Sequence, residues 1–497
     1  MNTDKTLERV GNAFTAVAKL PQVRRARDAA ALGTGPLDGF IRVHLRSSTD
    51  PYVLAVPADG RRTLALAWLA FGITALAASG VFSVLLVVSR TPGLKEVIPV
   101  ADFFRVALVA HVDLSVLVWF LAFSAMLWNL SGGRQALAVG WVALGVAAAG
   151  ALAMVAAPFV QRAAPVMANY VPVLDGTVFI GGLAVFALGV GLACARGMAV
   201  YVPVGTRMTG EGALRLGLNA SLVSAGIAAF ALAASFAQLD RALDAKTYYE
   251  LLFWGPGHVL QFAYTLIMLV AWLWLASAVG ARPPLTPRIA ALLFAIALAA
   301  VYLTPYIYLA HPVASVEHAK LQTWLMRFGG TLAVPPVALA VAWGLARAPR
   351  PGAEARPLRA SLMASLALFG AGGFIGLAIA GPDVRVPAHY HGCIVGVTLA
   401  MMGLTYLLLP RFGCAAPQSR WAAWQPWIYG SGQLMHIVGL AISGGYGVKR
   451  KVAGAEQVLR STPEVIGMGI MGAGGLLAIV GGLLFVLIVA RALGTRR

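Results

Sequence analysis

The sequence predicts an all-α membrane protein with twelve transmembrane helices. The chain is 59% hydrophobic and only 11% charged, a balance that excludes a soluble globular domain. It also contains apolar runs of spanning length, and its 55 glycines are typical of membrane helices that pack closely together. These three observations define the fold class before any motif is considered.

Each apolar run is long enough to cross a bilayer, because about 20 helical residues span the hydrocarbon core. The runs fall near residues 62–89, 102–130, 136–159, 174–195, 215–239, 248–279, 287–310, 319–346, 358–380, 386–410, 424–445 and 464–492. Residues 1–61 contain no apolar segment of signal-peptide type and are expected to form a cytoplasmic N-terminal arm. Residues 62–497 then form one twelve-helix membrane domain.

Arginines indicate the orientation of these spans. An even number of spans places both termini on one side, and the loops on that side carry most of the loop arginines. They are Arg134, Arg196, Arg207, Arg215, Arg282, Arg288, Arg347, Arg350, Arg356, Arg359, Arg411 and Arg420. The positive-inside rule therefore predicts cytoplasmic termini, and it explains the formal charge of +19 without a nucleic-acid partner.

Five of the eight histidines are predicted to share the outer part of the membrane, and they come from four different spans. They are His111, His258, His311, His389 and His391. An ionisable side chain at membrane depth is costly and marks function by default. Imidazole is also the commonest metal ligand and a common ligand of haem iron. The sequence therefore predicts one haem or metal cluster near the outer face, whereas His44, in the arm, is expected to be a surface residue.

The segment His389-Tyr390-His391 is the sharpest local signal within this cluster. Two residues along an α-helix correspond to about 200° around its axis, so the two imidazoles point to opposite sides. They can therefore ligate two hemes, one on each side of the helix. The alternative is a pair of hydrogen-bonded polar residues at a helix start, and the three further histidines at the same depth disfavour it.

The segment "PAHYHGCIVGVTLAMMGLTYLLLPRFG" resembles the tenth helix of the catalytic subunit I of heme-copper oxidases. The resemblance implies that His389 is the proximal ligand of a high-spin haem and that His391 ligates a low-spin haem. The second low-spin ligand would be His111, in "RVALVAHVDLSVLVWFLAF". By this resemblance the fold is a heme-copper oxidase subunit I-like bundle with two b-type hemes.

Two further segments resemble the copper-B site of the same family. "FWGPGHVLQFAY" implies that His258 is a metal ligand, and "YLAHPVASVEHAKLQTWLMRFGGTLAVPP" implies the same for His311. The metal is expected to be copper, with iron as the alternative. After the eleventh span, "SGGYGVKRK" implies that Arg450 and Lys451 lie near the haem propionates.

The departures from the family pattern bear on the reaction. Ala310 stands where the family usually has a further copper-B histidine, and Phe262 stands where the large oxygen-reducing branches have a tyrosine. Leu260 and Leu339 replace a glutamate beside the metal ligand and the lysine of a proton channel. Cleaving an O–O bond draws on that tyrosine and pumping needs polar channels, whereas reducing NO to N2O needs neither.

These losses favour an unconventional nitric oxide reductase that works with a cupredoxin-like or cytochrome c subunit in a bacterial inner membrane. One alternative is a terminal oxygen reductase with an altered copper-B site, in which Tyr306 or Tyr308 would replace the missing tyrosine. The other is a non-catalytic haem scaffold that serves as a transporter or assembly factor.

Three polar residues remain outside these assignments. His318 and Glu317 follow His311 closely, and on a continuous helix His318 would stand about 10 Å from it, too far for one ion. A chain turn after Pro312 could still bring either residue to the second metal or to a propionate, and a solvated loop is the alternative. His436 lies in the middle of a span and is expected to be a hydrogen-bonded packing residue.

Overall fold

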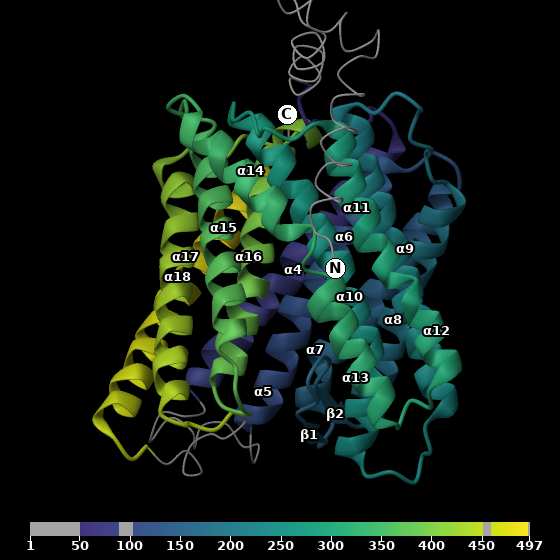
Figure 1. Cartoon of the computed structure of the whole chain (residues 1–497), viewed down its shortest axis with the longest axis vertical. Coiled ribbons are helices and arrows are strands. Elements are labelled where there is room, and N and C mark those ends of the chain that lie inside the picture. Colours follow the sequence, from purple (N-terminus) through teal and green to yellow (C-terminus); the bar gives the residue numbers. More distant parts are fainter. Residues whose placement is uncertain (1–49, 89–102, 451–458, 496–497) are drawn as a thin grey trace, which may run out of the picture.

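The structure is a computed structural model that describes residues 50–88, 103–450 and 459–495. Most of the expected N-terminal arm, including His44, lies outside the described residues, as does Lys451. The described chain forms a bundle of long helices that run along one common direction (Figure 1). The expected all-α membrane fold is confirmed.

The helices follow one another with few other elements between them. They are α4 (Gly60–Val88), α5 (Phe103–Val112), α6 (Trp119–Ser131), α7 (Leu137–Val160), α8 (Thr177–Ala199), α9 (Gly210–Gln238), α10 (Ala245–Ala278), α11 (Pro287–Val301), α12 (Leu303–Ala310), α13 (Val316–Trp324), α14 (Val334–Arg347), α15 (Arg356–Leu377), α16 (Arg385–Leu408), α17 (Arg420–Gly445) and α18 (Thr462–Gly494). Two π-helical segments, η2 (Asp113–Val118) and η3 (Leu325–Gly329), and a 3-10 turn, η4 (Pro410–Phe412), join some of them.

Eleven helical segments in the described part of the chain are long and apolar enough to cross a membrane. The twelfth expected span corresponds to α17, which has 26 residues but a more polar sequence that includes Gln425, Gln433 and His436. Helix α17 packs along α18 and against α15 and α16, so it belongs to the same bundle. Helices adjacent in sequence, such as α7 with α8 and α15 with α16, also pack side by side.

Three of the expected spans are interrupted rather than continuous. The span 102–130 passes from α5 through η2 into α6, the span 287–310 is broken at Tyr302 between α11 and α12, and η3 separates α13 from α14. Single π-helical turns inside membrane helices are frequently found at functional sites. The first of them begins two residues after His111.

Glycines allow α17 and α18 to approach closely. A Cβ atom on Gly474 would lie 2.5 Å from the backbone oxygen of Gly432 and 2.5 Å from the backbone nitrogen of His436. Only glycine leaves room for two backbones at this separation, as is common where membrane helices cross. The close approach places His436 directly against α18.

A short hairpin connects α7 to α8. Strand β1 (Ala164–Val166) pairs with β2 (Val173–Asp175) in antiparallel register, with Pro165 opposite Leu174. The hairpin lies at the same end of the bundle as α5, α12 and α13 (Figure 1). The loop between its strands carries Tyr170 toward α10, against which β1 packs.

Candidate functional site

The first histidine group lies between α4, α5, α16 and α17. His111 on α5 turns its Nδ1 toward α4, where it lies 2.8 Å from Ser79 Oγ, 2.9 Å from Ser83 Oγ and 3.0 Å from the carbonyl oxygen of Ser79. The ring of His391 on α16 lies 5.0 Å from that of His436 on α17, between centroids. The packing histidine expected at position 436 therefore contacts one of the expected haem ligands.

His389 faces a different neighbour from His391. Its Nδ1 lies 2.8 Å from the carbonyl oxygen of Gly372 on α15. A Cβ atom on Gly376 would lie 2.5 Å from the same nitrogen, so only glycine fits at this point of α15. The two imidazoles of the His-x-His segment thus contact different helices, α15 and α17, as the helical spacing predicts.

The second group surrounds His258 on α10, which is 2% exposed. Its Nδ1 lies 2.7 Å from the carbonyl oxygen of Trp254, one turn earlier on the helix. Its Nε2 lies 2.9 Å from the hydroxyl of Tyr170, which comes from the loop of the β1–β2 hairpin. Both ring nitrogens of His258 therefore have a partner.

His318 on α13 belongs to this second group. It is 1% exposed, its Nδ1 lies 3.3 Å from the carbonyl oxygen of His311, and its ring packs edge-on against Tyr308 at 4.5 Å. Among the described residues, none hydrogen-bonds to its Nε2. The chain does turn after Pro312, so His318 is buried in the bundle rather than solvated in a loop, whereas Glu317 is exposed.

One feature is shared by six histidines: Nδ1 lies within hydrogen-bond distance of a backbone carbonyl oxygen. They are His111, His258, His318, His389, His391 and His436. A carbonyl only accepts, so Nδ1 carries the hydrogen and Nε2 keeps its lone pair. Metal-bound and haem-bound histidines adopt this arrangement, because the second hydrogen bond fixes the ring and its tautomer. These side chains therefore fit the role of ligands to haem iron and to a metal ion.

The remaining expected ligand, His311, is placed less favourably. It ends α12 in an extended backbone conformation and is half-buried. Within the described residues its side chain makes no hydrogen bond that would hold the ring. In the same part of the chain, no three side chains of the His, Cys, Asp and Glu types lie close enough to hold one ion. An ion bound beside His258 needs a ligand of another kind.

The positions that depart from the family pattern have distinct surroundings. Phe262 is 2% exposed and lies in a small apolar cluster with Val259 and Ile307. Leu339, by contrast, is 70% exposed on the outside of the bundle. Tyr306 is also exposed, whereas Tyr308 is buried with its hydroxyl 2.8 Å from Ser235 Oγ.

Two buried polar residues close in the chain to these histidines were not predicted from the sequence. Asp113, at the start of η2, is 1% exposed and neither carboxyl oxygen has a hydrogen-bond partner among the described residues. Gln322, one turn after His318, is fully buried, and among the described residues neither its amide nitrogen nor its amide oxygen has a hydrogen-bond partner. Their presence inside apolar runs was a usable signal, since polar groups at membrane depth are costly. The contact of Tyr170 with His258 carried no such signal.

The expected propionate residue Arg450 lies at the same end of the bundle as the β1–β2 hairpin. Its Nη1 lies 3.3 Å from Asn169 Oδ1, next to Tyr170 in the hairpin loop. Nearby, Asp383 bonds the backbone nitrogen of Arg385 at 2.8 Å and its guanidinium at 2.6 Å. The Arg385 side chain lowers the pKa of the Asp383 carboxyl below its usual value. These contacts hold the start of α16, which carries His389 and His391.

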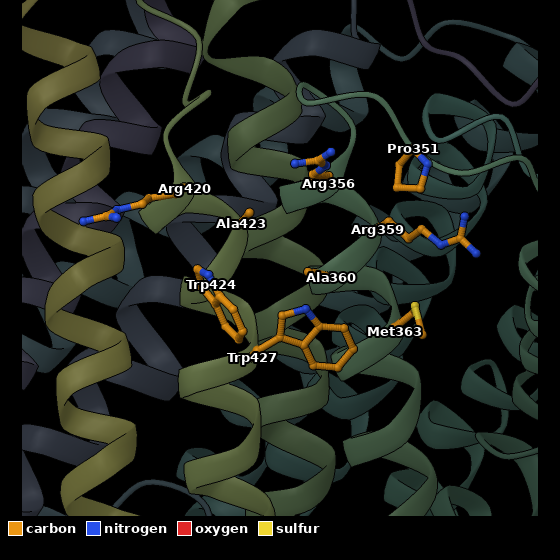
Figure 2. A pocket seen from close by; sticks show the side chains of 9 residues that line it. All are labelled: Pro351, Arg356, Arg359, Ala360, Met363, Arg420, Ala423, Trp424 and Trp427. Carbon is orange, nitrogen blue, oxygen red and sulfur yellow. The ribbon is translucent and has the colours of Figure 1, made fainter.

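A surface cavity of about 420 Å³ lies at the N-terminal ends of α15 and α17. Arg356, Arg359 and Arg420 line it together with Trp424 and Trp427, as Figure 2 shows. Arg356 and Arg420 begin α15 and α17, whereas the histidines of α16 and α17 lie toward the other end of the bundle. The cavity is therefore separate from the histidine groups. The arginines that line it belong to the loops expected to be cytoplasmic.

A bundle of membrane helices that carries two groups of histidines is typical of multi-pass membrane proteins that hold hemes or metals. Residues 63–483 match the family described as cytochrome c and quinol oxidase polypeptide I. Because this match covers most of the chain, the protein belongs to that family. It is accordingly a membrane-embedded respiratory oxidoreductase subunit of a family that carries hemes and a metal site.

Two curated relatives resemble the chain over most of its length. An uncharacterized protein of Rickettsia prowazekii is 26% identical over 87% of this chain and 96% of its own length. An uncharacterized protein of Aquifex aeolicus is 27% identical over 70% of this chain and 84% of its own length. Each match covers most of the relative's own length, and the first also covers most of this chain.

One solved structure shares the fold. It is a cryo-EM structure of a heme-copper terminal oxidase dimer, with a TM-score of 0.65, 17% sequence identity, and coverage of 89% of this chain and 85% of that chain. At this identity the similarity describes the arrangement of the helices. The substrate depends on the residues of the site.

Proposed function

We propose that this protein reduces nitric oxide to N2O at a high-spin haem held by His389. The observation that carries the proposal is the surrounding of Phe262, which is 2% exposed among apolar side chains such as Val259, Val301 and Leu325. The large oxygen-reducing branches of the family have a tyrosine at this place. Here the side chain at this place is a phenyl ring without a hydroxyl, and a charge within its apolar cluster would cost several kcal/mol.

The chemistry of NO reduction makes smaller demands on the protein. Two NO molecules, two electrons and two protons give one N2O and one water, so no O–O bond is broken. Two hemes and a non-haem metal would supply the electrons and polarise the bound oxygen atoms. The protein contributes the ligands, excludes bulk water, and admits protons from the outer side, where the histidine groups lie.

In this proposal each of five imidazoles has one role. His391 and His111 hold a low-spin haem, His389 holds the high-spin haem, and His258 with His318 holds the non-haem metal. His318 is favoured because its buried Nε2 lacks a hydrogen-bond partner among the described residues. A metal ion would satisfy that atom. His311, which the family resemblance assigns to the metal, is the alternative second imidazole.

The remaining expectations complete the proposal. The hemes are of b type and the metal is copper or iron. Electrons enter from a cupredoxin-like or cytochrome c subunit that docks on the outer face, and Arg450 lies near the propionates. The bundle spans a bacterial inner membrane with both termini in the cytoplasm, as the arginine-rich loops favour.

A terminal oxygen reductase is the second candidate. Tyr308 favours it, since this phenol is buried beside His318 and bonded to Ser235. Tyr306 does not, because it is 64% exposed and separated from both histidine groups by its position on the outside of α12.

The test uses purified protein in proteoliposomes with an electron donor outside. Under the proposal, NO turnover generates little membrane potential and does not acidify the exterior. Oxygen reduction with proton ejection, abolished by Tyr308→Phe and untouched by the control Tyr306→Phe, would favour the second candidate instead. A visible spectrum without hemes, or no bound metal, would favour a non-catalytic scaffold.

A further inference from the structure

The hydroxyl of Tyr170 forms a hydrogen bond with Nε2 of His258, the nitrogen that would bind a metal ion. Nδ1 of His258 faces the carbonyl oxygen of Trp254 at 2.7 Å and therefore carries the ring hydrogen. Nε2 then has a free lone pair, and the Tyr170 hydroxyl donates to it at 2.9 Å. A phenol from an outer loop thus stands at the expected metal position.

The surroundings of Tyr170 are shaped to receive it. Gly257 lies under the phenol ring, where a Cβ atom would collide with the ring carbons. The ring of Trp254 packs edge-on against Tyr170 with centroids 5.9 Å apart, and its Nε1 donates to the carbonyl oxygen of Ala319 at 3.1 Å. Next to Tyr170, the backbone nitrogen of Asn169 donates to Glu250 Oε2 at 3.0 Å. These contacts hold the loop on α10.

The metal site lacks a ligand that Tyr170 could supply. Ala310 stands where the family usually has another histidine, and no third His, Cys, Asp or Glu side chain joins the described histidines around one point. Nitrogen and oxygen ligands lie about 2.0–2.2 Å from a transition metal. The Tyr170 oxygen and the His258 nitrogen, 2.9 Å apart, are close enough that both could bind one ion.

We propose that the phenol oxygen of Tyr170 is the third protein ligand of the non-haem metal, beside His258 and His318. This proposal rests on the metal site of the proposed function. On binding, the metal ion replaces the phenolic hydrogen: the O–H bond breaks, a metal–oxygen bond forms, and the proton leaves to water at the outer face. The two atoms that would hold the ion, the Tyr170 oxygen and Nε2 of His258, are partners in one hydrogen bond in this structure.

The experiment compares Tyr170→Phe with wild type, using copper and iron as the added metals. The variant keeps the ring against Trp254 but loses the oxygen. We expect it to retain both hemes, to bind the non-haem metal at least about tenfold more weakly, and to lose the phenolate-to-metal charge-transfer band of the oxidised protein. Tyr170→His restores a ligand nitrogen and should recover metal binding without that band.

Tyr249→Phe is the matched control, because this phenol is also at the outer end of α10 but bonds Asp175, at 3.1 Å. It should keep both the metal and the band. Unchanged metal affinity and an unchanged band in Tyr170→Phe would overturn the ligand role, and tighter binding would do so too, since Tyr170 would then only compete with the metal. A wild-type protein with two hemes and no non-haem metal would instead overturn the proposed function.

Discussion

The imidazoles of His391 and His436 lie 5.0 Å apart between ring centroids and are inclined by 49° to each other. Each is anchored through Nδ1, His391 to the carbonyl oxygen of Pro387 at 2.8 Å and His436 to that of Met471 at 3.1 Å. In each ring, Nε2 is then the nitrogen that keeps its lone pair. Two imidazoles, rather than one, therefore lie near the place that the proposed low-spin haem would take opposite His111.

Substitution of His391 should decide between these imidazoles. We expect His391→Ala to lose the six-coordinate low-spin haem signal while the helices remain inserted, because an axial ligand is removed. His111→Ala should give the same visible and electron paramagnetic resonance spectra. His436→Ala should keep the signal with shifted bands, since it changes only what the ligand ring touches. If His436→Ala abolished the signal and His391→Ala preserved it, the ligand assignment would have to be exchanged.

The glycine beside His389 offers a gentler perturbation of the second haem. A Cβ atom on Gly376 would lie 2.5 Å from Nδ1 of His389, so Gly376→Ala must displace the imidazole. We expect a weakened high-spin haem signal and reduced turnover, with the low-spin haem unchanged. Gly373→Ala on the same helix is the control, because a Cβ atom there meets nothing within 4 Å. Equal spectra for the two variants would show that His389 is not a haem ligand.

His318 and His311 can be separated by their effects on the non-haem metal. We expect His318→Ala to keep both hemes and lose most of the bound metal, because it removes a buried ligand nitrogen. His311→Ala should have the smaller effect, since that ring is half-buried and not held by a hydrogen bond within the described residues. Elemental analysis after dialysis measures both. A larger loss of metal in His311→Ala than in His318→Ala would assign the ligand role to His311, as the family resemblance implies.

The sequence predicted most of the fold because membrane spans leave a strong local signal. Apolar length located the helices, and glycine abundance predicted close crossings such as that of Gly432 with Gly474. The loop arginines alone predicted an orientation in which five histidines lie at one membrane depth. The helical angle between His389 and His391 likewise anticipated their contacts with different helices.

The rest of the site depends on contacts between segments distant in the sequence. Nothing near Tyr170 in the chain indicates that its loop folds onto His258, since β1 and β2 place it there. The burial of His318 likewise follows from the chain turn after Pro312. The spacing of His318 from His311 in the sequence did not show whether this turn forms. The exposure of Leu339 shows in turn that an aligned position need not face the interior.

The Asp383 carboxylate should make the start of α16 sensitive to acid. Bonding to the Arg385 side chain lowers the pKa of Asp383 below its usual value of about 3.9. A carboxyl with a lowered pKa stabilises the folded protein above its ordinary pKa, and this contribution is lost as the pH falls from there toward the folded value. Asp383→Asn should therefore lower the apparent melting temperature at pH 7, for a loss of about 0.5–1 kcal/mol, and the difference from wild type should shrink as the pH falls below the ordinary pKa of the carboxyl.

The haem signals separate this local effect from general destabilisation. Asp59 and Arg61 form the same contact at the start of α4, with Arg61 N at 2.9 Å from Asp59 Oδ1, and Arg61 lowers the pKa of Asp59 to about 2. That pair lies at the opposite end of the bundle from His389 and His391. In an acid titration followed by absorbance, Asp383→Asn should release haem at higher pH than wild type, whereas Asp59→Asn should not. Identical haem release by the two variants would mean that Asp383 does not position α16.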